Sequence, residues 1–563
     1  MNPGEFSLLT PANISQTMKR IIIFTLLIIL SFLFSFAQKE TNNWYFGSQA
    51  GINFSGGAPV AMTNGSLSTT EGCTALSDAN GNLLFYSDGI KVYNSNHSQM
   101  PNGFGLLGYH DATQTALIVK KPGSNGIYYL FTVTDLANPN GIRYSIIDMS
   151  LNGGSGDVTI KNVLLQTPST EKMAAVKHKN GTDVWIVTHD WLSDAFRCFL
   201  LTSSGVSTLP VLSNAGLIHN GSNWNTNGYL KISPDGKKIA LAICHYINKF
   251  ELFDFDNSTG IVSNVISFPT YPAQIGAYGV EFSRDGTKLY GSLIAPGTIY
   301  QFDLCAGSPA AIINSATIIG SDVSWICALQ LGPDGKIYVA RSNRDSLGVI
   351  NNPNAPGMAC NYVNNGLWLG GNQSQLGLPS FESSYLSLIQ YYNLCFGDTT
   401  FFNLTDTTNV NSVFWEFDDP GSGIYNTSNL FNPYHLFSSQ GTYTVQLIRF
   451  NSGTAIDTLN FCITIASCPT PVETFSEMHP TCSLAPNPNN GFFKITVDGL
   501  YAKKTEVTIF DCTGKKGFSI TEKNINGSFS KEINLSQVPA GIYIVKILSD
   551  EFTRNIKMVL ADE

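Results

Sequence analysis

Two sets of polar and aromatic residues in this sequence could bind a ligand or do chemistry, and both fall between predicted strands. The first set comprises Glu71, His110, Asp111, Lys172, Trp224, Asn225 and Trp325. The second set comprises Asp88, Asp135, His189, Asp190, Trp191, His245 and Arg344. Aromatic faces stack on flat ligands while acids, amides and imidazoles orient them, so the mixture suits a glycan or a peptide. The alternative is that these residues are solvated loop tips with structural tryptophans.

Catalysis has weaker support in the sequence. Glu71 and His110 could serve as acid and base, but spacing along the chain does not give their distance, and we do not expect the pair to be catalytic. The sequence contains no G-x-S-x-G, H-E-x-x-H, phosphate-loop or EF-hand motif. None of its eight histidines lies at metal-ligand spacing from another. We therefore predict no catalytic residue, no metal site and no cofactor.

The elements that would position these loops repeat along the chain. Asn-Gly or Asp-Gly pairs recur at intervals of 45 to 55 residues, and each is followed by an apolar, strand-like run. The pairs are Asn80-Gly81, Asn125-Gly126, Asn180-Gly181, Asp235-Gly236, Asp285-Gly286 and Asp334-Gly335. Such pairs favour type I′ hairpins, in which both central residues need positive φ. Four short strands in each interval indicate one blade of a β-propeller.

The two ends of the repeat region complement each other. Residues 44–46 and 51–54 are typical of the second and third strands of a blade that lacks its first. Residues 376–381 can supply that strand, which closes the ring and removes open sheet edges. We therefore predict a seven-bladed β-propeller over residues 41–383. Loops between blades and loops joining second to third strands would then share one face and bring both candidate sets together.

Two turns of the repeat region resemble those of known propellers. They read S-P-D-G-K over residues 233–237 and G-P-D-G-K-I-Y over residues 332–338, and both are similar to turns of WD40-like repeats. No W-D dipeptide or G-H pair recurs in this chain. The whole N-terminal stretch also resembles a propeller group common in secreted Bacteroidetes proteins. That group has no assigned chemistry, so the resemblance implies a fold without an activity.

Composition favours an all-β chain and excludes one class of partner. Of 563 residues only 13% are charged, whereas 12% are aromatic and 51 are glycine, which is typical of many short strands joined by turns. The net charge is −9, and no basic run follows residue 38. Because a nucleic-acid partner demands a basic surface, we expect no nucleic acid to bind.

An export signal precedes the repeats. Lys19 and Arg20 are followed by an apolar run over residues 21–34 and then by small residues before Gln38, which is typical of a signal peptide cleaved after Ala37. We assign residues 1–37 to this signal, with Met18 as the true start. A membrane anchor is the alternative, but the run is shorter than the roughly 20 residues of a spanning helix. Export to an oxidising compartment permits disulfides among the 11 cysteines.

Residues 386–468 differ from the repeats. The segments W-E-F-D-D-P (415–420), N-P-Y-H-L-F (432–437) and G-T-Y-T-V (441–445) resemble a PKD domain, an Ig-like β-sandwich. That family usually reads W-x-F-G-D-G, so Asp418 and Pro420 stand where it has glycines. Trp415 fits the sandwich core, and His435 fits a structural hydrogen bond. The resemblance implies a spacer or a weak adhesive unit.

The cysteines lead to two further expectations. Cys73, Cys244 and Cys327 lie in apolar strand patterns, where a cysteine is typically a buried small hydrophobe. Cys395 and Cys462 flank the middle domain and could join its first and last strands by a disulfide. The count of 11 is odd, so at least one thiol is free or pairs between molecules.

After a linker over residues 469–480, the last segment forms a third unit. Residues 481–563 contain a P-N-P-x-x-G opening, a D-x-x-G-K turn and a G-I-Y-x-V strand, in that order. They closely resemble the type A C-terminal sorting domain of the type IX secretion system. The resemblance implies that the secretion machinery binds this domain, that the protein crosses the outer membrane of a Bacteroidetes-type bacterium, and that the tag is removed. The alternative is an ordinary accessory β-domain.

Together these features predict a secreted or cell-surface binding or adhesion protein, whose propeller recognises a glycan or a protein. The second hypothesis is an exported propeller enzyme, a hydrolase or lyase acting on polysaccharide. Carboxylates that converge on one face at about 5–10 Å would favour hydrolysis, whereas carboxylates that point apart into solvent would favour binding. A third hypothesis is a structural component of the cell surface.

Overall fold

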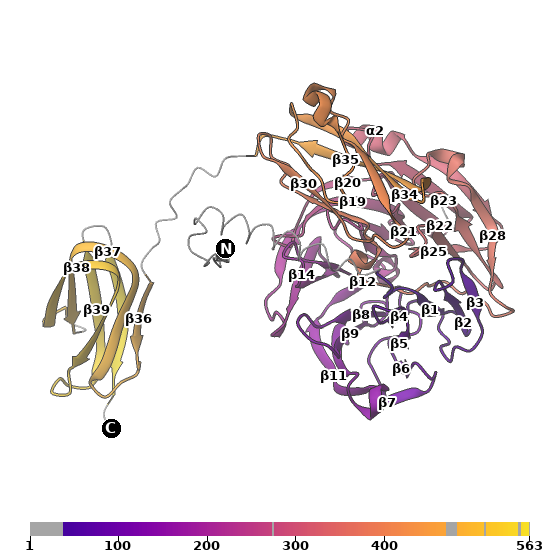
Figure 1. Cartoon of the computed structure of the whole chain (residues 1–563). Helices are drawn as coiled ribbons and strands as arrows, with labels where there is room; N and C mark the ends of the chain where they lie inside the picture. The colour runs from indigo at the N-terminus through magenta and orange to yellow at the C-terminus, as the bar shows by residue number, and fades with distance from the viewer. Residues whose placement is uncertain (1–37, 273–274, 469–480, 512–513, 550–552, 562–563) are drawn as a thin grey trace, which may run out of the picture. The chain divides into compact units, whose positions relative to one another are not determined.

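The computed structural model describes residues 38–272, 275–468, 481–511, 514–549 and 553–561, and its regular elements are almost all β-strands (Figure 1). The predicted signal peptide with its start at Met18, the predicted linker and Cys512 lie outside the described residues. The chain forms two compact units, Met1–Ala466 and Ser467–Glu563. Within the described residues, no helix is both long and apolar enough to cross a lipid bilayer.

The first unit begins with seven antiparallel sheets that follow one another along the chain, which confirms the predicted seven blades. The strands of blades one to four are β1 (Asn43–Phe46), β2 (Ala50–Asn53), β3 (Val60–Met62); β4 (Thr74–Ser77), β5 (Leu83–Ser87), β6 (Lys91–Asn94), β7 (Gln99–Phe104); β8 (Ala116–Lys120), β9 (Ile127–Val133), β10 (Ile142–Asp148), β11 (Asp157–Gln166); and β12 (Ser169–Lys177), β13 (Val184–Asp190), β14 (Ala195–Thr202), β15 (Gly205–Val206), β16 (Val211–Asn214). Neighbouring blades pack through their apolar faces, because strands such as β12 and β13 have buried side chains on both sides.

Blades five to seven have four strands each. They are β17 (Leu230–Ile232), β18 (Lys238–Ile243), β19 (Lys249–Asp256), β20 (Ile261–Ser267); β21 (Ile275–Phe282), β22 (Lys288–Ala295), β23 (Gly297–Asp303), β24 (Thr317–Asp322); and β25 (Ile326–Leu331), β26 (Ile337–Arg341), β27 (Ser346–Ile350), β28 (Tyr362–Trp368). Short helical turns join some elements: η1 (Asn152–Gly154), η2 (Asn223–Thr226), α2 (Pro309–Asn314), η3 (Gly357–Cys360), η4 (Ser383–Leu386) and η5 (Pro420–Asn426).

The six Asn/Asp-Gly pairs of the predicted series each join the first strand of a blade to its second, as the repeat predicted. We call the end of the propeller with these turns the turn end. The expected type I′ geometry is wrong. In blade five Gly236 N donates to Ser233 O at 2.8 Å, and Gly236 has a φ of +72° whereas Asp235 is not left-handed. The Asp235 carboxylate instead accepts from the Ser233 hydroxyl at 2.5 Å, which stabilises a four-residue turn with one left-handed glycine.

The predicted closing segment, residues 376–381, lies between blade seven and blade two together with residues 373–375. Leu376 N donates to Thr70 O at 2.8 Å, and Ala328 N donates to Leu376 O at 3.0 Å. The segment pairs through isolated bridges, such as Ser48 with Gln373, where a regular first strand was predicted. The ring is nevertheless closed, because the segment bonds to both neighbouring blades.

A two-sheet sandwich follows the propeller. One sheet contains β29 (Ile389–Tyr392), β30 (Thr400–Leu404) and β33 (Tyr434–His435), and the other contains β31 (Ser412–Glu416), β32 (Thr427–Ser428), β34 (Gly441–Asn451) and β35 (Thr454–Ile465). Trp415 is fully buried in the core between the sheets, as predicted. His435 contacts Asp419 Oδ2 at 3.0 Å and stacks on Phe417, which confirms its structural role. Asp418, which replaces a family glycine, has a φ of +57°.

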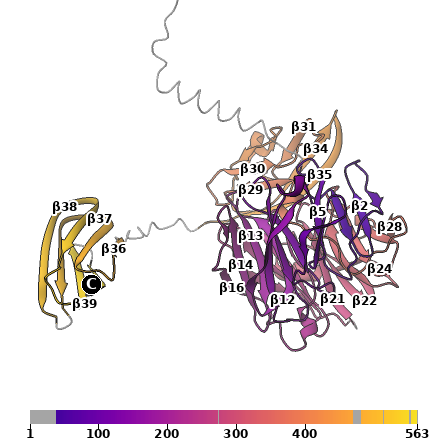
Figure 2. The same cartoon turned by 90° about the horizontal axis from the view of Figure 1, so that it is seen from below.

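The sandwich packs against the turn end of the propeller (Figures 1 and 2). Tyr391 OH donates to Asp235 Oδ2 at 3.0 Å. Arg284 Nε donates to Leu386 O at 3.3 Å, at the start of the sandwich. Both propeller residues belong to Asp-Gly turns, so the turn end of blades five and six is covered.

A disulfide joins the two domains of this unit. Cys462 bonds to Cys305, which follows β23, so the predicted bond between Cys395 and Cys462 is wrong. Its neighbours on β35, Phe461 and Ile463, point into the sandwich core, and alternation along the strand therefore turns Cys462 outward to the propeller.

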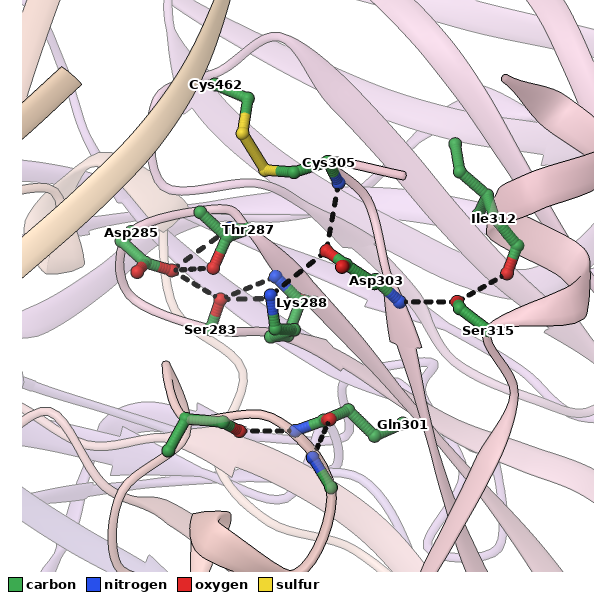
Figure 3. A network of polar contacts seen from close by, with 12 residues as sticks. Ser283, Asp285, Thr287, Lys288, Gln301, Asp303, Cys305, Ile312, Ser315 and Cys462 are labelled. Atoms are coloured by element: carbon green, nitrogen blue, oxygen red, sulfur yellow. Dashed lines mark hydrogen bonds and ion pairs between the residues drawn. A yellow bond between two sulfur atoms is a disulfide. The ribbon is translucent and has the colours of Figure 1, made fainter. Parts of the chain in front are cut away.

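Polar contacts fix the propeller side of this bond (Figure 3). Cys305 N donates to Asp303 Oδ1 at 3.1 Å, and Lys288 Nζ pairs with the same oxygen at 3.0 Å. Cys73, Cys244 and Cys327 are buried and free, as predicted.

The second unit is a single five-stranded sheet folded over one hydrophobic core. Its strands are β36 (Thr481–Ala485), β37 (Phe492–Phe510), β38 (Lys516–Asn534), β39 (Gly541–Ser549) and β40 (Thr553–Leu560). The two long strands pair with each other and contain a register shift between Asp498 and Leu500. Ile495 from the first half of β37 and Val507 from the second half are both buried in that core.

Replacing both Cys305 and Cys462 with serine should lower the free energy of unfolding by about 2–4 kcal/mol, because a disulfide restricts the unfolded chain between its ends. The bond spans a sequence separation of 157 residues. Urea denaturation of the two proteins measures the difference. Peptide mapping without reduction should recover Cys305 and Cys462 in one linked peptide, and a peptide linking Cys395 to Cys462 would contradict the structure.

Candidate functional site

The inner strands of the blades begin at one end of the propeller, which we call the loop end. There Glu71 N donates to His110 O at 3.0 Å, Thr113 N donates to Glu171 Oε2 at 2.8 Å, and Gly228 N donates to Thr113 Oγ1 at 3.3 Å. Further backbone bonds join Tyr229 to Tyr278, Ala328 to Leu376, and Leu376 to Thr70. These bonds link the loops between blades around the propeller axis.

Burial divides the predicted site residues into two groups. Those buried are Glu71, Asp88, Lys172, His189, Asp190, Trp191 and Asn225. Those exposed or half-buried are His110, Asp111, Asp135, Trp224, His245, Trp325 and Arg344. Only the second group can touch a ligand in this conformation.

Glu171 is the polar centre of the buried group, although the sequence did not single it out. Its carboxylate accepts from Thr113 N and Oγ1, from Leu136 N at 2.9 Å and from Thr226 Oγ1 at 3.0 Å. The adjacent Lys172 donates to the carbonyl oxygens of Thr226 and Asn227 at 2.8 and 2.9 Å. Burial lowers the pKa of Lys172 to about 7, while the Glu171 charge opposes that shift. Through these hydrogen bonds, the two side chains of blade four join it to blades three and five.

The Glu71 side chain is buried beside this cluster, although its backbone bonds to that of His110. Burial raises the pKa of Glu71 well above its usual value, and the charges of Glu171 and Asp111 raise it further. Its Oε2 has no hydrogen-bond partner among the described residues. The His110 ring is exposed and stacks on Tyr109 at 4.6 Å between centroids. The geometry therefore gives no support to Glu71 and His110 as an acid–base pair.

His189 and its neighbours are structural. Its ring stacks on that of His219 at 3.9 Å, and its Nδ1 contacts Asp190 O at 2.8 Å. Asp190 pairs with Arg197 at 2.7 Å. Both ring nitrogens of His219 are buried without a partner among the described residues. Burial lowers the pKa of His189 to about 3.

Trp224, Asn225 and His245 come together at the loop end of blade five. Trp224 lies in η2 and is 45% exposed, and its ring contacts that of His245 at 4.9 Å. Asn225 Oδ1 accepts from Tyr246 N at 3.1 Å, while its Nδ2 donates to Asn220 O at 2.8 Å. The buried amide thus joins a loop between blades to a second-to-third loop, and the Tyr246 ring beside it is 75% exposed.

Two aliphatic residues extend this group. Leu192 and Ile218 are both exposed. Leu192 N donates to His219 O at 2.8 Å, and His219 N donates to Ser193 O at 3.1 Å, so their two loops lie together. We call Leu192, Ile218, Trp224, His245 and Tyr246 the loop-end patch. Sequence reasoning missed Leu192, Ile218 and Tyr246, although Leu192 and Tyr246 directly follow the predicted Trp191 and His245.

Trp325 and Arg344 form a smaller exposed group at blade seven. Arg344 Nε donates to Ser324 Oγ at 2.6 Å, next to the exposed Trp325 ring. Asp111 and Asp135 are half-buried, and Asp88 accepts from Lys91 N at 2.7 Å in its own loop. Among the described residues, no three His, Cys, Asp or Glu side chains gather as metal ligands.

Comparison with known proteins identifies one domain. Residues 483–561 match a family model described as a secretion system C-terminal sorting domain. The match confirms the predicted sorting domain and indicates export by the type IX secretion system, with secreted or cell-surface localisation. No curated protein matches the chain.

Several solved structures resemble the chain at a TM-score of 0.32. A protein from Lactobacillus plantarum is 11% identical, and the match covers 68% of this chain and 93% of that one. The Cps50 (Swd1) β-propeller domain of Myceliophteria thermophila is 10% identical, with 54% and 94% covered. A quinonprotein alcohol dehydrogenase-like protein from Bacteroides thetaiotaomicron is 14% identical, with 61% and 76% covered. Similarities this low carry no argument about activity.

Replacing His189 with glutamine should flatten the fall in stability on acidification. The unfolded histidine binds a proton near pH 6.5, whereas the folded one does so near its pKa of about 3. Between these values the unfolded state gains a proton that the folded state lacks, so stability falls by up to ~1.4 kcal/mol for each pH unit. Thermal melts between pH 7.5 and 4.5 measure this slope.

The matched control is His110→Gln, which removes an exposed histidine and should keep the slope of the original protein. Equal slopes for His189→Gln and the original protein would show that the buried imidazole is not responsible.

Proposed function

We propose that this chain is an exported cell-surface binding or adhesion protein, and that the loop end of its propeller is the recognition surface. The observation that carries this proposal is the loop-end patch, where the exposed rings of Trp224 and Tyr246 lie on either side of His245 in sequence and close to its ring, and Leu192 and Ile218 are exposed on adjoining loops. Soluble proteins seldom expose such groups together unless a ligand covers them.

The arrangement of the domains supports the choice of this end. The sandwich covers part of the turn end through Tyr391 and Arg284, whereas Trp224 and Tyr246 at the loop end are exposed among the described residues. Hydrogen bonds also fix the loops of the patch. The Asn225 amide accepts from Tyr246 N, and the His219 carbonyl accepts from Leu192 N. A preformed surface loses little conformational entropy when it binds.

The chemistry of the patch suits a glycan or a protein. The rings of Trp224 and Tyr246 offer apolar faces on which a sugar or an aromatic side chain can stack. His245 and the polar residues of the 218–225 loop offer hydrogen bonds at the rim. The PKD-like sandwich would then act as a spacer that holds the recognition surface away from the cell, as the sequence resemblance implies.

The hydrolase hypothesis receives less support. Glu71 and Glu171 both contact Thr113 near the propeller axis, so two carboxylates do converge there. Both are buried, however, and Glu171 is saturated by hydrogen bonds. A glycosidase needs carboxylates that reach the substrate, which favours binding over hydrolysis.

Screening residues 38–563 on a glycan and peptide array should identify a saturable ligand, and Trp224→Ala should weaken its binding by about tenfold, or ~1.4 kcal/mol. The matched control is Trp368→Ala, which removes a tryptophan that is 63% exposed on the outermost strand of blade seven. If both variants bind the ligand as the original protein does, the loop-end patch is not the recognition surface.

Deleting residues 481–563 should trap the protein in the periplasm, because the secretion machinery would no longer recognise it. Fractionation of an expressing bacterium with a type IX system measures the distribution. The control Trp224→Ala leaves the sorting domain intact and should reach the surface normally. Normal surface display of the truncated chain would refute the sorting role.

A further inference from the structure

A cleft of about 420 Å³ opens at the turn end, where blades four and five meet the sandwich. Its propeller wall comes from the turns that follow β12, β17 and β19. Its sandwich wall comes from residues 390–395, on and just after β29. The cleft is separate from the loop-end patch, because Trp224 precedes β17 whereas the cleft lies beyond the other end of that strand.

Direct contacts between the propeller and the sandwich fix the two walls of this cleft relative to each other. Lys237 Nζ lies 3.2 Å from the centroid of the Tyr391 ring and donates to Tyr391 O at 3.3 Å. Tyr391 OH in turn donates to Asp235 Oδ2. The disulfide between Cys305 and Cys462 adds a covalent link between the same two domains. The site is therefore preformed, which lowers the entropic cost of binding.

Positive charge exceeds negative charge along the lining. The lining cations are Lys177, Lys179 and Lys237, and the lining carboxylates are Asp235 and Asp256. Asp256 accepts from the hydroxyls of Ser258 and Thr259 at 2.6 and 2.8 Å, and Asp235 accepts from Tyr391. Neutral donors thus satisfy both carboxylates, and neither forms an ion pair with a lining lysine among the described residues.

The lysines differ in how far their charge is already balanced. Burial lowers the pKa of Lys237 to about 8, and its ammonium group is occupied by Tyr391. Glu40 and Glu382 face Lys177, and its Nζ lies 5.9 Å from the centroid of the buried Tyr385 ring, so the charge of Lys177 is partly balanced. Lys179 is exposed and forms no ion pair within the described part of the chain. Lys179 is therefore the lysine of the lining best placed to pair with a ligand, although its charge also lowers the pKa of Asp256.

The neutral lining suits a sugar. Tyr392 is 44% exposed and is held by stacking on Phe401 at 5.4 Å between centroids, so its outer face is a fixed platform. Gln390, Asn393 and Asn257 bring amide groups to the same cleft. An aromatic platform with amides at its edge binds the face and the hydroxyls of a sugar ring.

We propose that this cleft binds an acidic oligosaccharide, with Lys179 pairing with the carboxylate of a uronate unit. Tyr392 stacks on one sugar ring, and the amides of Gln390, Asn393 and Asn257 bond to hydroxyl groups. The protein then has two binding sites, one at each end of the propeller, and the sandwich is part of the second site rather than a spacer alone.

Isothermal titration of residues 38–563 with tetragalacturonate tests this proposal. Lys179→Ala should weaken binding by about tenfold, or ~1.4 kcal/mol. The control Lys121→Ala removes a lysine from the equivalent turn of blade three, outside the cleft, and should bind as the original protein does. Equal affinity of Lys179→Ala and Lys121→Ala, or no binding by the original protein, would overturn the proposal.

A second pair of variants tests the sugar platform. Tyr392→Ala should weaken binding, whereas Tyr434→Ala removes an exposed tyrosine outside the cleft and should not. Maltotetraose should bind far more weakly than tetragalacturonate because it lacks carboxylates. Equal affinity for the two would overturn the proposal that a lysine of the cleft binds a carboxylate.

An acidic peptide is the competing occupant. Tetraglutamate has carboxylates without sugar rings, so it should bind more weakly than tetragalacturonate and be insensitive to Tyr392→Ala. Tighter binding of tetraglutamate would overturn the proposal in favour of a peptide site. Tetragalacturonate binding that is lost in Trp224→Ala and kept in Lys179→Ala would place the sugar at the loop-end patch and overturn the proposal.

Discussion

Closure of the ring by residues 373–381 is the constraint on which the rest of the structure depends. Leu376 bonds to Thr70 on one side and to Ala328 on the other, so the segment joins blade two to blade seven. An open ring would expose sheet edges and let the inner strands separate. Because the loops between blades bond to one another around the axis, the geometry of the loop end also depends on this closure.

The two ends of the closed ring have different surroundings. At the turn end, the sandwich covers part of the propeller and is fixed there by Tyr391, Arg284 and the disulfide to Cys305. At the loop end, the rings of Trp224 and Tyr246 are exposed among the residues of the first unit that the structure describes. The protein thus offers one free surface and one cleft between domains, and each suits a different ligand chemistry.

How much of the candidate site could be predicted depended on burial. The loops that contain Glu71 and Trp224 were predicted correctly, because turn residues and strand patterns place them between blades. The prediction of Lys172 in such a loop is wrong, because Lys172 lies within strand β12. The sequence also could not show that the side chain of Glu71 is buried while that of Trp224 is exposed, since burial depends on the neighbouring blades. Apolar loop residues such as Leu192 were missed because chemistry was sought among polar and aromatic types.

The sequence by itself determined the features that depend on neighbouring residues: the alternating strands, the repeated Asn/Asp-Gly turns, the seven blades and the sorting domain at residues 483–561. Local hydrogen bonds and strand alternation encode these directly. Only the tertiary structure decided that Cys462 bonds to Cys305, that Glu171 joins neighbouring blades by hydrogen bonds, and that a cleft lies beside Tyr392. Those features arise where segments that are distant in sequence come into contact. The number of residues between two segments does not determine which sides of their domains face each other.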